Sequence, residues 1–245
     1  MIVNSTEVQN NFGKYLLLSA QEDIIITRNG VPVAKLSALQ DDPSGLGSVP
    51  NMVREEAHKV GYGRKKATYE EFLKLTKDTE ERYEYIDGEM YLLASPKTPH
   101  QTALVELFGQ FYNWFQGKEC RPFVAPYDIT LKRSPEQISV VQPDIMIICD
   151  LDEKLGDDGY YKGVPTLLVE ILSESTARKD LIQKLDLYMS CGVKEYWIVD
   201  PEDKLVLVYS FRDGGLGDQA LYRLPKNAQS QVFPGLAADL AWVFR

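Results

Sequence analysis

Two acidic residues stand in apolar segments that are typical of buried strands. Asp144 opens the segment Asp144-Ile145-Met146-Ile147-Ile148, and Glu170 lies inside Leu167-Leu168-Val169-Glu170-Ile171. Adjacent strands could bring both carboxylates onto one hard cation, because Mg²⁺ binds carboxylate and phosphate oxygens. Such an ion can activate water and stabilise charge that develops on a phosphodiester. We therefore take Asp144 and Glu170 as candidate ligands of Mg²⁺ or Mn²⁺.

Each carboxylate also has a purely structural interpretation. Asp144 could cap a turn, and Glu170 could pair with a buried lysine or arginine. A carboxylate buried without a partner is costly, so a single acid in a strand is more often paired than catalytic. Two acids with a lysine nearby reverse that preference.

The position of that lysine is unusual. Residue 172, two after Glu170, is leucine, so the acid-x-Lys pattern of many nucleases is broken. Lys184 lies on a helix expected over residues 176–190 and could reach back to hold the attacking water or the scissile phosphate. Asp180 and Lys184 are four residues apart, and this spacing alone favours a solvated salt bridge worth about a few tenths of a kcal/mol.

The elements that position these residues follow from the hydrophobic pattern. We expect buried strands over 144–148, 166–172 and 195–200, with a helix over 176–190 that ends at Gly192. Strand, helix and strand in this order predict a parallel crossover. Further expected elements are a capped helix at Thr68 and Glu71, a hairpin around Asp87-Gly88, a helix over 99–115, and strands at 123–125, 128–131, 204–209, 221–224 and 240–244.

A smaller segment precedes this part of the chain. We place it at residues 1–40, followed by a linker with a short helix over 41–62 and a second domain over 63–245. The first segment is expected to form a strand, a helix that begins at Asn4, and a hairpin at Asn29-Gly30 whose returning strand is an edge or bulged strand because of Pro32. About forty residues bury too little core to fold alone, so this segment should dimerise or pack on the second domain.

This segment resembles the N-terminal part of Phd/YefM-type antitoxins. The matching stretches are Asn11-Phe12-Gly13, residues 24–30 and Pro32-Val33-Ala34. The resemblance implies a dimer that binds operator DNA. A second domain stands in place of the toxin-neutralising tail, so a toxin partner is less strongly implied than dimerisation. DNA binding and pure dimerisation both remain open interpretations.

A series of short motifs runs in order through residues 68 to about 210. They are residues 83–89, Ser95-Pro96, 99–101, 142–145, 169–173, Ser175-Thr176, Asp180, Lys184, Tyr188, 192–197 and Asp200-Pro201. With these motifs the region resembles the Uma-type restriction endonucleases of the PD-(D/E)XK superfamily. This resemblance implies a restriction-endonuclease-like α/β core with a central mixed sheet flanked by helices. It implies that Asp144 and Glu170 bind the metal, that Lys184 is a lysine moved onto the helix, and that Glu84 is an additional acid.

Composition sets the remaining limits. The net charge is −9 and the pI is about 4.9, which argues against a protein that coats DNA non-specifically. The three cysteines are too scattered to predict a disulfide framework or a zinc cluster, and no signal peptide or membrane span is recognisable, so a reducing cytoplasm is expected. His100 could contact phosphate or act as an acid, or simply cap or pack its helix.

These observations lead to two functional hypotheses. The first is a cytoplasmic, homodimeric, Mg²⁺- or Mn²⁺-dependent endonuclease that hydrolyses DNA, with Glu84, Asp144, Glu170 and Lys184 as its site. The second is a DNA-binding repressor or antitoxin-like protein whose nuclease fold is silent. Action on RNA or on modified DNA is a weaker third possibility that the sequence does not separate from the first.

Overall fold

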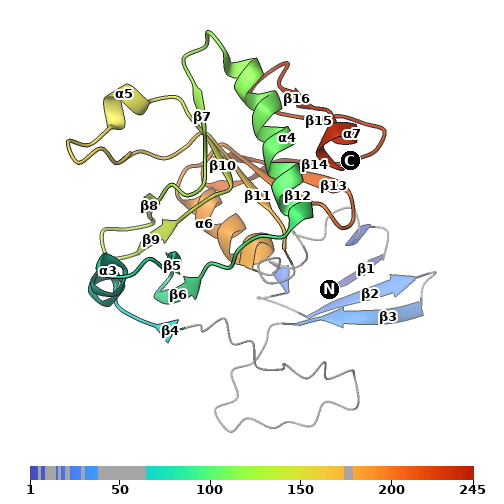
Figure 1. Cartoon of the computed structure of the whole chain (residues 1–245). Helices are drawn as coiled ribbons and strands as arrows, with labels where there is room; N and C mark the ends of the chain where they lie inside the picture. The colour runs from blue at the N-terminus through green and yellow to red at the C-terminus, as the bar shows by residue number, and fades with distance from the viewer. Residues whose placement is uncertain are drawn as a thin grey trace, which may run out of the picture. The chain divides into compact units, whose positions relative to one another are not determined.

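The chain forms two compact units, Met1–Lys59 and Val60–Arg245 (Figure 1). A computed structural model describes residues 1–4, 7–8, 15, 18–19, 23–28, 31–37, 65–173 and 179–245. The predicted linker helix and the Asn29-Gly30 turn lie outside these ranges.

The first unit contains a three-stranded sheet in the order β1 (Ile2–Asn4), β2 (Ile24–Arg28) and β3 (Val31–Leu36). β1 and β2 are parallel, whereas β2 and β3 are antiparallel. The predicted hairpin strands are therefore confirmed. Pro32 lies on the edge strand β3, opposite Thr27, where the register shifts. This position agrees with the inability of proline to donate a ladder hydrogen bond.

The second unit is built on a six-stranded mixed sheet. Only one neighbouring pair, β11 with β12, is parallel, as the predicted crossover requires, and the other pairs are antiparallel. The strand order is β14 (Gly215–Arg223), β13 (Leu205–Arg212), β12 (Glu195–Asp200), β11 (Leu167–Ile171), β10 (Ile145–Ile148) and β7 (Arg121–Val124).

A second sheet of five strands belongs to the same unit. Its hairpin turns at Asp87 and Gly88, where φ is +49° and +84°, as a two-residue turn with two positive φ values requires. Thr68 and Glu71 form the predicted capping box of α3 (Tyr69–Lys77). The strand order is β4 (Lys65–Lys66), β6 (Glu89–Leu92), β5 (Tyr83–Ile86), β9 (Ile138–Val141) and β8 (Ile129–Lys132).

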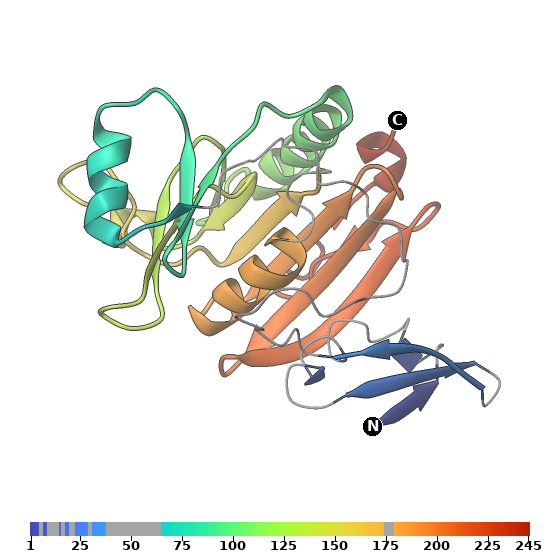
Figure 2. The same ribbon diagram turned by 90° about the horizontal axis from the view of Figure 1, so that it is seen from below.

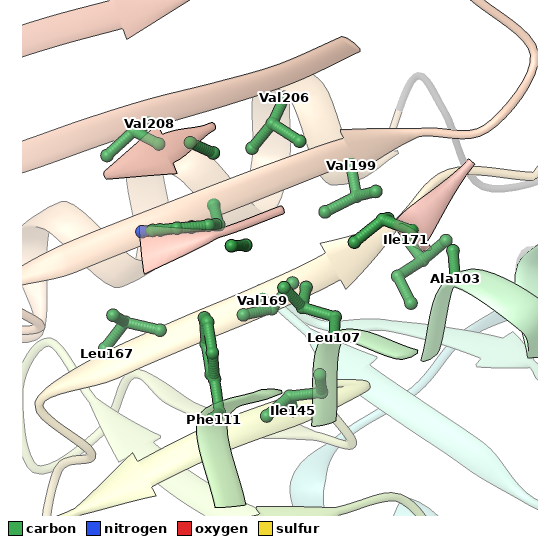
Figure 3. Close-up of a cluster of buried hydrophobic side chains, with 14 of the residues drawn as sticks. Ala103, Leu107, Phe111, Ile145, Leu167, Val169, Ile171, Val199, Val206 and Val208 are labelled. Carbon is green, nitrogen blue, oxygen red and sulfur yellow. The ribbon is translucent and has the colours of Figure 1, made fainter. Parts of the chain in front are cut away.

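Both faces of the six-stranded sheet are covered (Figure 2). On one face, Leu107 and Phe111 of α4 (Thr98–Phe115) pack against Ile145 and Val169 (Figure 3). On the other face, α6 (Leu185–Ser190) packs against the alternate side chains, which include Leu168. Because strand side chains alternate between faces, Glu170 shares the α6 face with Leu168. The face of a strand residue therefore decides which helix can supply its partner.

Three predictions need correction. The strand expected at 240–244 is the helix α7 (Leu240–Val243), because the Asp239 side chain accepts a hydrogen bond from Ala241 N and the helical spacing buries Leu240 and Val243 together. The helix expected over 176–190 is, within its described part, a π-helix η1 (Lys179–Lys184) followed by α6. Contrary to the expectation drawn from cysteine spacing, Cys120 and Cys149 form a disulfide at the paired ends of β7 and β10.

The remaining short elements are α5 (Leu151–Lys154), β15 (Ala228–Gln229) and β16 (Ala237–Ala238). The helix end predicted at Gly192 is confirmed, since α6 ends at Ser190 and Gly192 has a φ of +92°. Among the described helices, none has the length and apolar character that a membrane crossing requires.

Candidate active site

Three buried charges meet where the two sheets adjoin. Nζ of Lys184 lies 2.8 Å from Oε1 of Glu84 and 2.7 Å from Oε1 of Glu170. Their side chains are almost fully buried, with exposed fractions of 2% for Lys184, 0% for Glu84 and 5% for Glu170. A buried ion pair requires close geometry and further hydrogen bonds to offset desolvation. The arrangement satisfies this requirement and joins residues that are a hundred positions apart in sequence.

The solvated interpretation of Lys184 is therefore wrong. An exposed salt bridge would leave the ammonium in water, whereas this ammonium is enclosed by two carboxylates. The α-helical spacing behind that interpretation does not apply either, because Lys184 ends a π-helix. The side chain of Asp180 lies outside the described part of the chain.

Tyr188 is a further hydrogen-bond partner of Glu170. Its hydroxyl donates to Oε1 of Glu170 at 2.7 Å, and the ring is fully buried. Lys184 and Tyr188 are four residues apart across the start of α6, so they point to the same side. One oxygen of Glu170 thus accepts hydrogen bonds from both an ammonium and a phenol, which fixes the orientation of the carboxylate.

Asp144 lies beside Glu170 at the end of two adjacent strands. Ile145 pairs with Val169, and one further step of this register places Asp144 opposite Glu170. Oδ2 of Asp144 accepts a hydrogen bond from the backbone N–H of Ile171 at 2.7 Å. The strand pairing thus places the two acids on neighbouring strands, as the hydrophobic pattern led us to expect.

His100 lies on the other side of Asp144. Its Nε2 is 3.3 Å from Oδ2 of Asp144, and the imidazole comes from the first turn of α4. Nδ1 is buried and has no hydrogen-bond partner among the described residues. His100 therefore contacts the candidate site through Asp144.

The short connection between the two sheets also contacts the buried charges. Gln142 and Pro143 link β9 to Asp144, and the backbone N–H of Gln142 donates to Oε1 of Glu84 at 3.0 Å. Nearby, Asp128 is exposed at the surface. Desolvation by the protein atoms around its carboxyl group nevertheless raises the pKa of that group. A hydrogen bond from Gln142 opposes this rise, and the charge of Glu84 adds to it. Asp128 therefore adds a further carboxyl group to the surroundings of Glu84.

A third buried acid, Glu195, has a different role. It lies on the α4 face of the sheet and accepts hydrogen bonds from Trp197 Nε1 at 2.6 Å and from the backbone N–H groups of Gln231 and Val232 at 2.6 and 2.8 Å. Glu195 thus anchors the loop before β16 to β12. Its satisfied environment marks it as a structural acid.

Asp144 and Glu170 are the side chains of this cluster that could hold a divalent cation. Within the described ranges, no three His, Cys, Asp or Glu side chains are grouped closely enough to enclose an ion. Mg²⁺ commonly uses one or two carboxylates and completes its shell with water and substrate phosphate. Asp144 and Glu170 can supply two carboxylates, and the described residues provide no hydrogen bond to Oδ1 of Asp144.

Comparison with known proteins places the chain in a family. Residues 69–241 match the model of the Uma2 family, described as "Putative restriction endonuclease". The chain belongs to the Uma2 family. The match extends over the whole region that contains Glu84, Asp144, Glu170 and Lys184.

Two individual proteins are similar to this Uma2 chain. The uncharacterized protein slr1290 of Synechocystis is 26% identical over 160 residues, which cover 65% of this chain and 82% of the relative. The crystal structure of a putative nuclease belonging to DUF820 from Anabaena variabilis has a TM-score of 0.58 at 20% identity and covers 72% of this chain and 97% of the other. The second likeness shows that the two chains share the mixed α/β fold.

Some contacts of the Uma2 site were not predicted from the sequence. The position of Tyr188, four residues after Lys184, could have suggested a shared helix face. The contact of His100 with Asp144 had no such local signal, because the start of α4 and the start of β10 are more than forty residues apart. The approach of Gln142 to Glu84 likewise depends on how the two sheets meet.

Proposed function

We propose that this chain is a Mg²⁺- or Mn²⁺-dependent endonuclease that hydrolyses phosphodiester bonds of DNA. The observation that carries the proposal is the burial of Lys184 between Glu84 and Glu170, next to Asp144. Three carboxylates and one ammonium leave an excess of negative charge, which a divalent cation would neutralise. Membership of the Uma2 family supports the same chemistry.

The side chains divide the work as follows. Asp144 and Glu170 would hold the metal, with Glu84 as an additional carboxylate beside them. A metal bound there would polarise a phosphate oxygen and lower the pKa of a bound water. Tyr188 and Lys184 fix one oxygen of Glu170, which orients the carboxylate toward the ion. Lys184 also places a positive charge where it would position the nucleophilic water and stabilise the developing phosphate charge.

Calorimetric titration with Mn²⁺ tests the site directly. Wild-type protein should bind the ion, and the double variant Asp144→Ala, Glu170→Ala should lose this binding while remaining folded. The matched control is Asp152→Ala, which removes an acid whose side chain is 81% exposed and pairs only loosely with Arg121 at 3.4 Å. Retained binding in the double variant would place the metal elsewhere.

Cleavage of supercoiled plasmid tests the reaction. The wild type should convert the plasmid to nicked and linear forms when Mg²⁺ or Mn²⁺ is added, and Asp144→Ala, Glu170→Ala and Lys184→Met should each remove this activity. Linear DNA with blocked ends separates endonuclease from exonuclease action. Activity on RNA alone would contradict the proposed substrate.

A second function has its own supporting observations. Leu172 occupies the position where the acid-x-Lys pattern needs lysine, and the net charge of −9 disfavours broad DNA binding. Both favour a DNA-binding repressor or antitoxin-like protein with a silent nuclease fold. Under this alternative, the chain would shift a specific DNA fragment in a salt-dependent manner without cleaving it in either metal.

A further inference from the structure

Arg133 forms a bridge between two elements of the proposed site without touching the site itself. It directly follows β8, and only 18% of its side chain is exposed. Nη1 lies 2.7 Å from Oδ2 of Asp186, and Nη2 lies 3.4 Å from Oδ2 of Asp87. One guanidinium thus contacts two carboxylates from different parts of the chain.

Both partners are close in sequence to the buried charges. Asp87 is three residues after Glu84, in the turn between β5 and β6, and Asp186 is two residues after Lys184, in the first turn of α6. Arg133 therefore connects the hairpin that carries Glu84 to the helix that carries Lys184. The Glu84–Lys184 ion pair connects the same two elements from within the core.

The chemistry of this bridge requires arginine. A planar guanidinium offers donors in fixed directions, so it can face two carboxylates at once, whereas a lysine ammonium is a single point charge. Nε of Arg133 is buried and has no partner among the described residues, so the two Nη atoms make the carboxylate contacts. The arginine side chain is 18% exposed, whereas the side chains of Asp87 and Asp186 are 52% and 48% exposed, so solvent partly screens these ion pairs.

The backbone of the β5–β6 turn is also constrained, so the contact between Asp87 and Arg133 acts on a fixed turn. Asp87 has a φ of +49°, and its backbone N–H donates to Oγ of Ser139 at 3.4 Å. The backbone of Asp87 thus contacts β9 through Ser139, and the Asp87 carboxylate contacts Arg133. A second cross-link, from the Tyr91 hydroxyl to Gln183 at 2.9 Å, joins β6 to η1.

We propose that Arg133 is a positioning residue that aligns Glu84 with Lys184 by clamping the β5–β6 turn against α6. This inference rests on the proposed nuclease function for its catalytic consequence, but the alignment is a property of the fold. Displacement of a reacting group by about 1 Å can cost about a hundredfold in rate. Loss of the clamp should therefore affect turnover more than substrate binding.

The variants Arg133→Ala and Arg133→Lys test the clamp. The control is Arg212→Ala, because Arg212 also pairs with an aspartate, Asp218 at 3.0 Å, but its side chain is 74% exposed. We expect Arg133→Ala to lower kcat for plasmid cleavage by between about tenfold and a hundredfold with little change in KM. Arg133→Lys should recover part of this loss through Asp186, and Arg212→Ala should have no effect.

A measurement independent of activity is the NMR signal of the Lys184 side-chain ammonium in ¹⁵N-labelled protein, assigned with Lys184→Met. A shifted or broadened signal in folded Arg133→Ala protein is the expected result. A wild-type signal together with wild-type kcat would overturn the proposal. If Arg133→Ala does not fold, Asp186→Asn removes the closer half of the clamp and decides the same question by the same signal. If the wild type cleaves no DNA, the nuclease proposal fails, and the NMR comparison still tests the clamp.

Discussion

The ammonium group of Lys184 offsets the negative charge of two buried carboxylates, those of Glu84 and Glu170. Replacement by methionine keeps the approximate volume but removes the ammonium group that contacts both Glu84 and Glu170. Removal of one partner from a buried ion pair typically costs about 3–5 kcal/mol. We predict that Lys184→Met lowers the free energy of unfolding by about this amount, as measured by urea denaturation.

The companion variant separates charge from packing. Adding Glu84→Gln to Lys184→Met removes one of the two like charges, so part of the lost stability should return. A non-additive result of this kind is expected for residues that share one network. Equal stability of Lys184→Met and the wild type would contradict the buried arrangement.

Glu195 provides the opposite case among the buried acids. Its carboxylate satisfies Trp197 and two backbone N–H groups, and glutamine would present an amide N–H to one of these donors. An unsatisfied buried donor costs about 1–3 kcal/mol. We predict that Glu195→Gln lowers stability by this amount and leaves Mn²⁺ affinity unchanged. A thermal melt and a Mn²⁺ titration of the same sample measure both, and a change in Mn²⁺ affinity would mean that Glu195 contributes to the site.

The difference between the two kinds of acid shows what the sequence can predict at this scale. Both Glu170 and Glu195 stand in apolar strands, and an acid in such a strand must be either paired or used. Its face and its partner decide between these roles, and both are set by residues far away in the chain. Asp144 and Glu170 could be singled out from their strands, whereas the position of Lys184 on a helix gives no local sign of its burial.

At the scale of elements, the sequence predicted the helices, strands and turns that depend on local hydrophobic patterns and turn residues. The strands β10, β11 and β12, the α4 helix and the Asp87-Gly88 turn follow from hydrophobic runs and turn residues. Three features could not be predicted from such patterns because they depend on packing between distant segments. They are the strand order, the π-helix that ends at Lys184 and the helix that begins at Leu240. The late segment 240–244 is too short for its periodicity to separate strand from helix.

Two glycines provide an element-scale prediction with a built-in control. Gly88 lies in the β5–β6 turn with a φ of +84°, and Gly109 lies inside α4, and an added Cβ would meet nothing within 4 Å at either position. Gly88→Ala should lower stability by about 1–2 kcal/mol because of backbone strain. Gly109→Ala should raise it by about 0.5–1 kcal/mol, since alanine loses less backbone entropy in a helix. Chemical denaturation of the two variants measures both signs, and destabilisation by Gly109→Ala would contradict the open helix surface.

At the scale of the whole molecule, net charge and substrate must be reconciled. A chain with a net charge of −9 repels DNA at long range, so its contacts must be local. A divalent cation at Asp144 and Glu170 would neutralise the excess negative charge where the scissile phosphate binds. Cleavage should therefore depend on metal for substrate affinity as well as for chemistry.

The first unit gives the last prediction, which concerns assembly. Its described core consists of Val3, Val8, Tyr15, Ile24 and Ile26, with Leu18 and Leu36 at its margin. A segment of about forty residues rarely supports a free-standing domain, and association of two copies is a common solution. We predict that the full chain is a homodimer and that residues 60–245 alone form a folded monomer. Light scattering coupled to size-exclusion chromatography distinguishes these states.

The shorter chain also separates assembly from chemistry. It retains Glu84, Asp144, Glu170 and Lys184, so its Mn²⁺ affinity should equal that of the full chain. Its plasmid cleavage should shift from linear toward nicked product, because double-strand cleavage requires two active sites on one duplex. A dimeric fragment 60–245 would move the interface to the second unit, and a monomeric full chain would remove the dimer altogether. Either result would leave the metal site intact while changing how two strands of a duplex could be cut.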